Sequence, residues 1–352
     1  MLKRNWALLT IIFLAASLYG IQCSESEANN QFDTTVFVAT WNLENLFDTI
    51  DHPEKNDEEF TPDGRKQWTE TRLENKINNL AKLFQDMNDG KGPDILGVQE
   101  VEHERLLSQL LSKVDNQKEY KIAYEESLDK RGIDNGLIYN SEIFELLSKS
   151  KHEIELDSKR PTRYILESEL LVGGRDTLFV FVNHWPSRSG GQERSEPNRI
   201  RAAEVQKAAF DSVISRNISA NIIILGDFND EPENISLSNT LLVNNSFDRE
   251  EVLDFPNTEL YNLSYKLFEE GQGTYLYQGD WNMLDQIIVS GDLLDSTGLY
   301  YQPGTFEILN FDYSVTKEGR YKGASIPTYG GRNYLGGFSD HFAVGIKLKI
   351  IE

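Results

Sequence analysis

Short apolar runs that end abruptly in polar residues are the feature that most constrains the fold of this chain. Residues 221–225 read Asn-Ile-Ile-Ile-Leu and are followed at once by Gly-Asp-Phe-Asn-Asp. A short apolar run bounded by glycine predicts a buried β-strand. Residues two apart in an extended chain point to the same side. We therefore expect Asp227 and Asn229 to be presented together at a strand end, where a carboxylate and an amide suit a hydrated metal ion or a phosphate.

The tripeptide Ser339-Asp340-His341 forms a second polar motif. It stands directly before the apolar stretch 342–351, which is typical of a strand. A carboxylate beside an imidazole is equipment for general acid–base catalysis. Surface loops also contain Asp, Asn and His, so either motif alone is compatible with a solvated loop. Their occurrence together favours a reactive site.

Four more apolar runs carry polar residues at their ends. These runs span residues 36–41, 94–99, 178–182 and 284–289. The polar residues at their ends are Asn42, Glu44, Glu100, His184 and Asp285. Six predicted strand ends therefore carry carboxylate, amide or imidazole side chains. Two of the five histidines of the chain, His184 and His341, lie at these strand ends.

The order of these motifs resembles that of the endonuclease/exonuclease/phosphatase superfamily. The matching segments are Trp-Asn-Leu-Glu-Asn, Gln-Glu, Asn-His-Trp-Pro-Ser-Arg, Gly-Asp-Phe-Asn-Asp, Leu-Asp-Gln and Ser-Asp-His, within about residues 34–350. The superfamily includes pancreatic-type deoxyribonucleases, abasic-site endonucleases, neutral sphingomyelinases and inositol polyphosphate 5-phosphatases. The resemblance implies an α/β (α+β) fold, a four-layered α/β/β/α sandwich of two stacked mixed sheets flanked by helices. It also implies a metal-dependent phosphoric ester hydrolase.

The resemblance assigns catalytic roles to five residues. His184 is expected to contact the scissile phosphate and to neutralise developing charge. Asp227 and Asn229 are expected to orient the attacking water and to hold a phosphate oxygen. His341 is the expected acid or base, and Asp285 is expected to accept a hydrogen bond from its ring, which would fix the tautomer and raise the basicity of the imidazole.

The resemblance also implies a divalent metal site. It places Asn42, Glu100 and Asp340 there, with Glu100 as the direct ligand and Glu44 as a weaker candidate. A hard ion such as Mg²⁺ is usually held by one or two carboxylates while it keeps several waters, which suits this set. The sequence has neither a thiolate cluster nor a His-Glu-x-x-His motif, so zinc is the weaker assignment. Mn²⁺ and Ca²⁺ stay open as alternatives.

Three further residues are candidates for substrate binding. Arg188 follows His184 closely enough to reach a second phosphate, because arginine forms forked hydrogen bonds to oxyanions. An exposed loop arginine is the alternative interpretation. Asp134 either orients His184 and contributes to the site or is a turn aspartate before a strand. Arg131 is expected to add local positive charge near the site.

Residues 1–22 have the pattern of a secretory signal peptide, because Lys3 and Arg4 precede an apolar stretch over residues 6–21. Cys23, the single cysteine, follows directly and resembles the lipid-acceptor residue of a bacterial lipoprotein, although Gln22 makes the cleavage motif imperfect. Residues 23–33 would then form an acidic tether. These features predict an extracytoplasmic protein, either an outer-membrane lipoprotein anchored through Cys23 or a secreted one.

Residues 34–352 are expected to form a single catalytic domain. The candidate site residues come from both ends of this stretch, from Asn42 to His341, so two independent domains would divide the site. Apolar spacing predicts helices over residues 72–87 and 198–214.

The net charge bears on the substrate. The chain has 35 basic and 57 acidic residues, a formal net charge of −22. Proteins that hold nucleic acid without regard to sequence usually neutralise phosphates with Lys and Arg. We therefore expect weak nucleic-acid binding, with catalysis depending on the local field.

Three functions are compatible with the motifs. The first is an endonuclease that cleaves DNA or RNA. The second is a phosphatase or phosphodiesterase that acts on inositol phosphates or phospholipid headgroups, for which Tyr275, Tyr277 and Trp281 offer an aromatic contact surface or simply pack around Asp285. The third, a non-catalytic binding lipoprotein, is disfavoured because the acidic and imidazole positions are intact. No obligate protein partner is implied.

Overall fold

The computed structural model describes residues 33–115, 117–245 and 256–351. The expected signal peptide, Cys23 and nearly all of the expected tether lie outside the described residues. Within those ranges, no helix is long and apolar enough to cross a membrane.

The first sheet has seven strands and contains both ends of the described chain. In order across the sheet, its strands are β14 (Leu299–Tyr301), β18 (Ala343–Ile351), β1 (Asp33–Leu46), β2 (Ile95–Val101), β4 (Asp134–Asn140) and β3 (Tyr120–Tyr124), and β15 (Glu307–Leu309) also pairs with β18. Strands β1 and β2 are parallel. Strands β1 and β18 are antiparallel, so that Asp33 lies opposite Ile351.

The second sheet also has seven strands. In order they are β5 (Phe144–His152), β6 (Ile165–Val172), β7 (Asp176–His184), β8 (Asn221–Asp227), β13 (Asp285–Ser290), β10 (Leu260–Asn262) and β9 (Val243–Asn244). Strands β7 and β8 are parallel, whereas β8 and β13 are antiparallel. Two short hairpins lie outside the sheets, β11 (Tyr275–Tyr277) with β12 (Asp280–Asn282) and β16 (Tyr329–Gly330) with β17 (Asn333–Tyr334).

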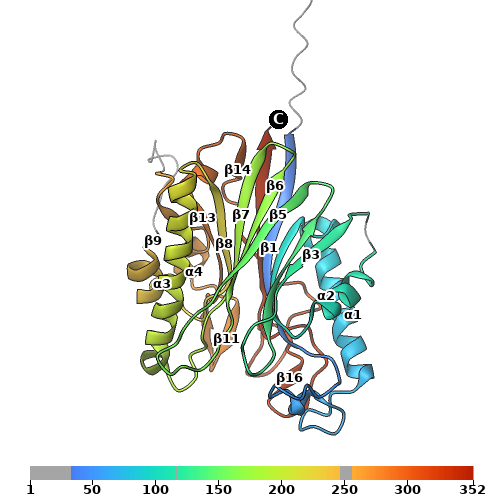
Figure 1. Ribbon diagram of the computed structural model, residues 1–352. Coiled ribbons are helices and arrows are strands. Elements are labelled where there is room, and N and C mark those ends of the chain that lie inside the picture. The colour runs from blue at the N-terminus through green and yellow to red at the C-terminus, as the bar shows by residue number, and fades with distance from the viewer. Residues whose placement is uncertain (1–32, 116, 246–255, 352) are drawn as a thin grey trace, which may run out of the picture.

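Helices cover the outer face of each sheet, which confirms the predicted four-layered sandwich (Figure 1). Helices α1 (Glu70–Gly90) and α2 (Glu104–Leu111) flank the first sheet, and α3 (Gln192–Arg216) with the π-helical turn η2 (Ser236–Leu241) flanks the second. The remaining short helices are η1 (Glu58–Phe60), α4 (Tyr265–Glu269) and η3 (Gly291–Leu294).

The two predicted helices are present with wider bounds. The backbone of α1 leaves helical geometry at Met87, where the sequence expectation ended. Helix α3 begins six residues before the predicted start at residue 198, because it accommodates Pro197 near its beginning.

The core consists of one apolar layer between the sheets and one beneath the helices of each sheet. Strand β1 contributes to two of these layers, because Val36 and Val38 face the second sheet while Phe37 and Ala39 pack toward the α1 side. A strand that is buried on both faces reads as a continuous apolar run. This double burial explains why the runs in the sequence marked the central strands.

The two sheets approach closely beneath the strand ends. A Cβ atom added at Gly97 in β2 would lie 2.3 Å from Cδ1 of Leu225 and 3.3 Å from Cγ2 of Val182. A larger residue at this position would require the side chain of Leu225 to move, so glycine allows the closest packing of the two sheets here. Glu100, three residues further along β2, is thereby brought toward the ends of β7 and β8.

Candidate active site

The register of the second sheet lines up three of the predicted site residues. His184, the last residue of β7, pairs with Asp227 at the end of β8. Asp227 in turn pairs with Asp285, the first residue of β13. Because β13 runs antiparallel to β8, its beginning lies at the same edge as the ends of β7 and β8, so the three side chains are adjacent.

The predicted site residues line one cleft at this edge of the sandwich, which has a volume of about 780 Å³. Those found in its wall are Glu100, His184, Asp227, Asn229, Asp340 and His341, together with Arg131 and Arg188. Asn42 and Asp285 lie directly behind it, bonded to Asp227 and His341 respectively. The structure therefore brings together residues that are up to 299 positions apart in the sequence (341 minus 42).

The predicted hydrogen bond between Asp285 and His341 is present. Oδ2 of Asp285 lies 2.7 Å from Nδ1 of His341, and both side chains are buried. Burial opposes protonation of the ring, but the carboxylates of Asp285 and Asp227 outweigh it and raise the pKa of His341 well above its usual value. The surroundings of His341 therefore favour its protonated form, and its Nε2 lies 4.0 Å from Oδ2 of Asp227.

Asp227 is held by two hydrogen bonds. Its Oδ2 accepts a bond from Nδ2 of Asn42 (3.0 Å), and its Oδ1 accepts a bond from the backbone N–H of Asn229 (2.9 Å). Burial raises the pKa of Asp227 to about 6, with a further contribution from the charge of Asp285. A buried, oriented carboxylate of this kind suits a group that takes a proton from water.

His184 differs from His341 in its electrostatic environment. Burial lowers the pKa of His184 well below its usual value, and the positive charges of Arg163 and Arg131 act in the same direction. Its Nε2 lies 3.6 Å from Oδ2 of Asp227 and 3.7 Å from Oε1 of Glu100. The pKa values of the two imidazoles are thus shifted in opposite directions, which gives the two rings different chemical roles in one site.

Three strand exits at the cleft adopt left-handed backbone conformations. The φ angles are +50° at Glu44, +63° at Glu100 and +51° at Asn229. Residues other than glycine adopt this region at a cost of roughly 1 kcal/mol each. Glu44 and Glu100 lie where the pairing of β1 and β2 shifts register shortly before these strands end, and Asn229 lies two residues beyond β8. Glu100 and Asn229 are thereby left in the cleft wall.

Glu100 and Asp340 provide carboxylates that fit a hard divalent cation. Oε2 of Glu100 accepts a hydrogen bond from the backbone N–H of Asn45 (2.8 Å), while Oε1 faces the His184 ring. Burial and the negative charges of Glu44 and Glu100 raise the pKa of Asp340 to about 7. Carboxylates that disfavour each other's ionised form are stabilised by a shared cation. Mg²⁺ held here would neutralise a phosphate oxygen and the leaving oxygen.

Acidic and imidazole atoms of Asp227, Asp285 and His341 lie close enough together to hold a metal ion. Nδ1 of His341 is already bonded to Asp285, and the pKa of the ring favours the protonated form, which cannot bind a metal. The oxygen atoms of Glu100 and Asp340 are therefore the better donors for Mg²⁺.

Glu44 does not act as the expected weaker metal ligand. Its Oε2 accepts a hydrogen bond from the backbone N–H of Thr328 (2.6 Å) and its Oε1 one from Tyr329 (3.4 Å). It is not part of the cleft wall. The left-handed turn directs its carboxylate to the segment 326–338 that leads into the Ser339-Asp340-His341 motif.

Lys76 of α1, which the sequence did not single out, completes this anchor. Its fully buried Nζ donates to Oγ1 of Thr328 (2.6 Å) and to the carbonyl oxygen of Phe338 (2.5 Å), and lies 3.7 Å from Oε2 of Glu44. Burial lowers the pKa of Lys76, whereas Glu44 and Asp340 favour its charged form. Lys76 stands among apolar residues at helical spacing, and nothing in the local sequence distinguishes it from an exposed lysine.

Two predicted substrate contacts are corrected. Asp134 does not orient His184, because its oxygens accept hydrogen bonds from Oη of Tyr124 (2.6 Å) and the backbone N–H of Ser127 (2.8 Å), and it is not in the cleft wall. Arg188 is neither free for a second phosphate nor simply exposed. Its guanidinium donates to the carbonyl of Asn229 (2.7 Å) and to the side chains of Asn282 and Asn234 (2.8 and 3.2 Å).

Positive charge at the cleft comes from Arg131 and from the unpredicted Arg163. The side chain of Arg131 is 48% exposed and pairs with Asp129 (3.3 Å). Arg163 is buried and donates to the carbonyl of Trp185 (2.6 Å), while its Nε has no hydrogen-bond partner among the described residues. Arg163 is separated from the strand-end motifs in the sequence, so the pattern that found the other residues did not include it.

Asp230, the last residue of the Gly-Asp-Phe-Asn-Asp motif, has a structural role. It is fully buried and lies 2.7 Å from Nε of Arg199 in α3. Ser236 and Gln192 donate hydrogen bonds to its two oxygens (2.6 and 2.9 Å). This buried ion pair fixes the loop after β8 against the outer helix layer.

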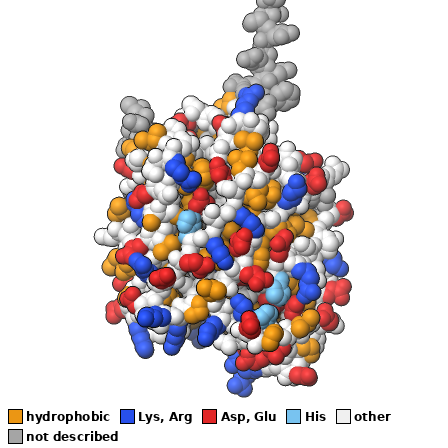
Figure 2. Space-filling view, in the orientation of Figure 1, with side chains coloured by type: hydrophobic (Ala, Val, Ile, Leu, Met, Phe, Trp, Pro, Cys, Tyr) orange, Lys and Arg blue, Asp and Glu red, His pale blue; other side chains and the backbone are white. Residues whose placement is uncertain are grey.

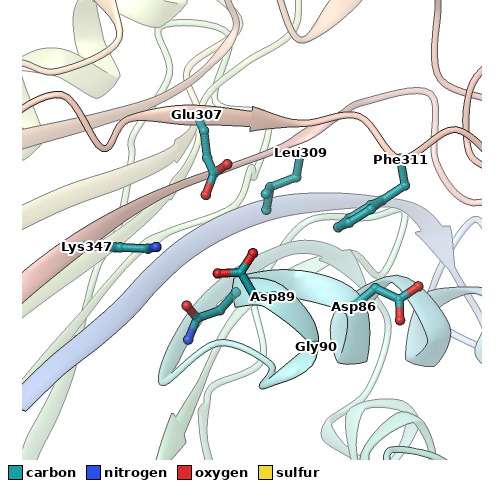
Figure 3. A pocket seen from close by; sticks show the side chains of 8 residues that line it. Asp86, Asp89, Gly90, Glu307, Leu309, Phe311 and Lys347 are labelled. Atoms are coloured by element: carbon teal, nitrogen blue, oxygen red, sulfur yellow. The ribbon is translucent and has the colours of Figure 1, made fainter.

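A second hollow lies between the end of α1 and β15 (Figure 3). It holds about 410 Å³ and is lined by Asp86, Asp89 and Glu307, with Lys347 at one side. It shares no residue with the catalytic cleft. Three carboxylates around one small space repel an anion, so the cleft between the sheets is the candidate phosphate site.

The fold and the cleft define a phosphoester hydrolase with an acidic metal site and two imidazoles. A family model described as "Endonuclease/Exonuclease/phosphatase family" matches residues 37–350. The chain belongs to this family, whose enzymes are metal-dependent phosphoester hydrolases.

Solved structures with the same fold are distant in sequence. TDP2 from Caenorhabditis elegans is 17% identical, with a TM-score of 0.52 over 90% of this chain and 75% of that chain. TDP2 from D. rerio, complexed with a single-strand DNA product, is 12% identical (TM-score 0.54; 90% and 99% covered). A mannosyl-6-phosphatase from Bacteroides thetaiotaomicron is 15% identical (TM-score 0.51; 89% and 99% covered). No curated protein sequence matches the chain.

Replacing the buried lysine should destabilise the protein. We expect Lys76→Met to lower the free energy of unfolding by about 3 kcal/mol, because it leaves Glu44 buried without its cation. Urea denaturation measures the loss. Lys82→Met is the matched control, since Lys82 lies on the same helix in an exposed pair with Asp86 and should change stability by less than about 1 kcal/mol. Equal losses in the two variants would contradict the anchor.

The Asp285–His341 pair should be visible in the titration of the ring. In the wild type, the imidazole signals of His341 in an NMR titration should remain those of the protonated ring at pH 7. Asp285→Asn should move the titration to lower pH. Because the pKa is raised in the folded chain, the stability from the pair is fully present below the pKa of an unfolded histidine, about 6.5, and is lost as the pH rises through the folded value. An unchanged titration in Asp285→Asn would refute the pairing.

Proposed function

We propose that this protein is an extracytoplasmic, Mg²⁺-dependent endonuclease that cleaves DNA or RNA by attack of water on phosphorus. The size and lining of the cleft support the proposal best. A volume of about 780 Å³ is far larger than one phosphate group, and acidic, imidazole and arginine side chains line the same space. A substrate that continues on both sides of the phosphate suits such a cleft.

The residues support a direct displacement. Water attacks phosphorus while its proton passes to the carboxylate of Asp227, which Asn42 and the backbone of Asn229 hold in place. The protonated ring of His341 donates a hydrogen bond to a phosphate oxygen and neutralises its charge. As the bond from phosphorus to the leaving oxygen breaks, the leaving oxygen takes a proton from solvent water, and Arg131 stabilises the anionic phosphate product. Asp227 then returns the proton it took to the solvent, so that the net reaction consumes one water.

Neutral His184 has a complementary role in this scheme. Its Nε2 lies between Glu100 and Asp227 and is directed to a second phosphate oxygen as a hydrogen-bond donor. Glu100 and Asp340 hold the cation. Asn42 lies behind the cleft wall and supports Asp227 through a hydrogen bond. The proposal keeps Glu100 and Asp340 at the metal site and moves Glu44 to the anchor. It changes two other roles, because Asn42 supports Asp227 and Asp227 takes the proton that was expected to pass to His341.

The charge of the molecule favours a second candidate, a phosphatase or phosphodiesterase for small esters such as inositol phosphates, sugar phosphates or phospholipid headgroups. The net charge is −22. Figure 2 shows acidic and basic side chains interspersed over one face instead of a basic stripe that would follow a nucleic-acid backbone. One structure of the same fold is a mannosyl-6-phosphatase.

Nicking of supercoiled plasmid separates the two candidates. The purified chain should nick plasmid in Mg²⁺ and lose this activity in EDTA. Asp227→Ala should lower the rate on the order of 10³-fold, because the carboxylate that takes the proton is removed. Asp312→Ala, a change at an exposed carboxylate, serves as the control. Phosphate release from sugar or inositol phosphates without nicking would favour the second candidate.

The extracytoplasmic assignment depends on the expected leader and on Cys23, which we propose carries a lipid anchor. Labelled palmitate supplied to a bacterial host that processes lipoproteins should be incorporated into the wild type and not into Cys23→Ser. Signal peptide removal without labelling of the wild type would indicate secretion in place of anchoring.

A further inference from the structure

We propose that Tyr275 and Tyr277 form a stacking platform for an unpaired nucleobase beside the scissile phosphate, so that the substrate is single-stranded nucleic acid. The inference rests on the proposed nuclease function and specifies its substrate. Tyr275 and Tyr277 both line the catalytic cleft.

The platform continues from the catalytic imidazole. The ring of Tyr275 lies against that of His341, with centroids 4.7 Å apart and planes inclined by 29°. The ring of Tyr277 is nearly parallel to that of Tyr275, with centroids 6.3 Å apart and planes inclined by 12°. Residues two apart in a strand share a side, which places both tyrosines of β11 on one side of the hairpin. Three rings therefore form a row from the reactive centre outward.

Core packing does not account for Tyr277. Its side chain is 56% exposed, while Tyr275 is half-buried and His341 is buried. By contrast, Trp281 on the partner strand packs against Phe342 with centroids 6.1 Å apart. Of the three aromatic residues noted in the sequence, Trp281 thus has the packing role, and Tyr277 is an exposed residue that lines the cleft.

The hairpin that carries the platform is attached to the catalytic residues. Oγ1 of Thr274 accepts hydrogen bonds from the backbone N–H groups of Leu284 and Asp285 (3.2 and 3.1 Å). The carbonyl of Thr274 accepts a bond from the N–H of Phe342 (2.9 Å), and Asn282 accepts one from Arg188 (2.8 Å). The platform is therefore fixed relative to both members of the Asp285–His341 pair.

A nucleobase is the chemical group that these rings fit. Stacking on an aromatic side chain contributes about 1–3 kcal/mol per base and tolerates any base, since each has a π face. A choline headgroup would bind such rings through its positive charge, without any dependence on a base, so removal of a base from the substrate distinguishes it from a nucleobase. Bases in a duplex are already stacked on their neighbours, so an unpaired base is required. Stacking is also nearly independent of net charge, which gives an acidic protein a means of holding a polyanion.

The test combines removal of the ring with removal of the base. KM and kcat are measured in Mg²⁺ with single-stranded oligonucleotides in which one nucleotide at a time lacks its base. For the wild type, removing the base beside the cleavage position should raise KM about tenfold. For Tyr277→Ala, KM for the intact strand should rise by a similar factor, and most of the dependence on the base should disappear.

Two variants control the experiment. Tyr277→Phe keeps the ring and should recover the affinity that Tyr277→Ala loses. Tyr321→Ala removes another exposed tyrosine, 48% exposed and outside the cleft wall, and should behave as the wild type. Thermal melting of each variant checks that it is folded, and Tyr277→Leu replaces Tyr277→Ala if the latter melts early.

The outcomes distinguish the inference from the function on which it rests. Equal dependence on the base in the wild type and Tyr277→Ala, with normal cleavage of oligonucleotides, would overturn the platform alone. Faster cleavage of duplex than of single strands would also overturn it. Failure of the wild type to cleave any oligonucleotide would overturn both the platform and the nuclease proposal.

Discussion

At the catalytic edge, the two sheets are joined by polar contacts instead of apolar packing. The amide of Asn42 in the first sheet bonds to Asp227 in the second, and Asp285 in the second bonds to His341 ahead of β18 in the first. Burying charged groups costs several kcal/mol each unless they are paired and hydrogen-bonded. The apolar layer between the sheets supplies the cohesion that permits this polar seam. Catalytic geometry therefore depends on the way the two sheets are stacked.

The same seam explains why its two imidazoles differ. His341 lies against two carboxylates, whereas the buried ring of His184 is affected by the positive charges of two guanidinium groups. The register of the second sheet places His184 beside Asp227, and the stacking of the first sheet on the second brings His341 to within 4.0 Å of the same carboxylate. Left-handed turns at the strand exits add local strain, a cost that functional sites commonly carry. Rigidity behind the site comes from the buried pairs Arg199–Asp230 and Lys76–Glu44.

The sequence predicted the parts of the site that follow from strand periodicity. Apolar runs located the central strands, and the polar residues at their ends were brought together as expected, including the Asp285–His341 bond. The predicted contacts of Glu44 with the metal and of Asp134 with His184 differ from the hydrogen bonds that these residues make. The direction of a side chain after a turn depends on backbone φ and on neighbours distant in sequence. Lys76 and Arg163 were missed for a related reason. Their roles arise from tertiary contacts that leave no local pattern.

The pairing of β1 with β18 has a consequence for how the molecule is presented to its surroundings. Asp33 lies opposite Ile351, at the end of the sandwich away from the catalytic edge (Figure 1). A support, fusion partner or membrane joined at either of these positions would meet the rear of the domain. The cleft would then open outward, into the solution from which a phosphoester substrate arrives. The point of attachment and the opening of the cleft thus lie at opposite ends of the sandwich. For the same reason, a linker that joined the start of β1 to the end of β18 would give a circular chain whose cleft stays unobstructed.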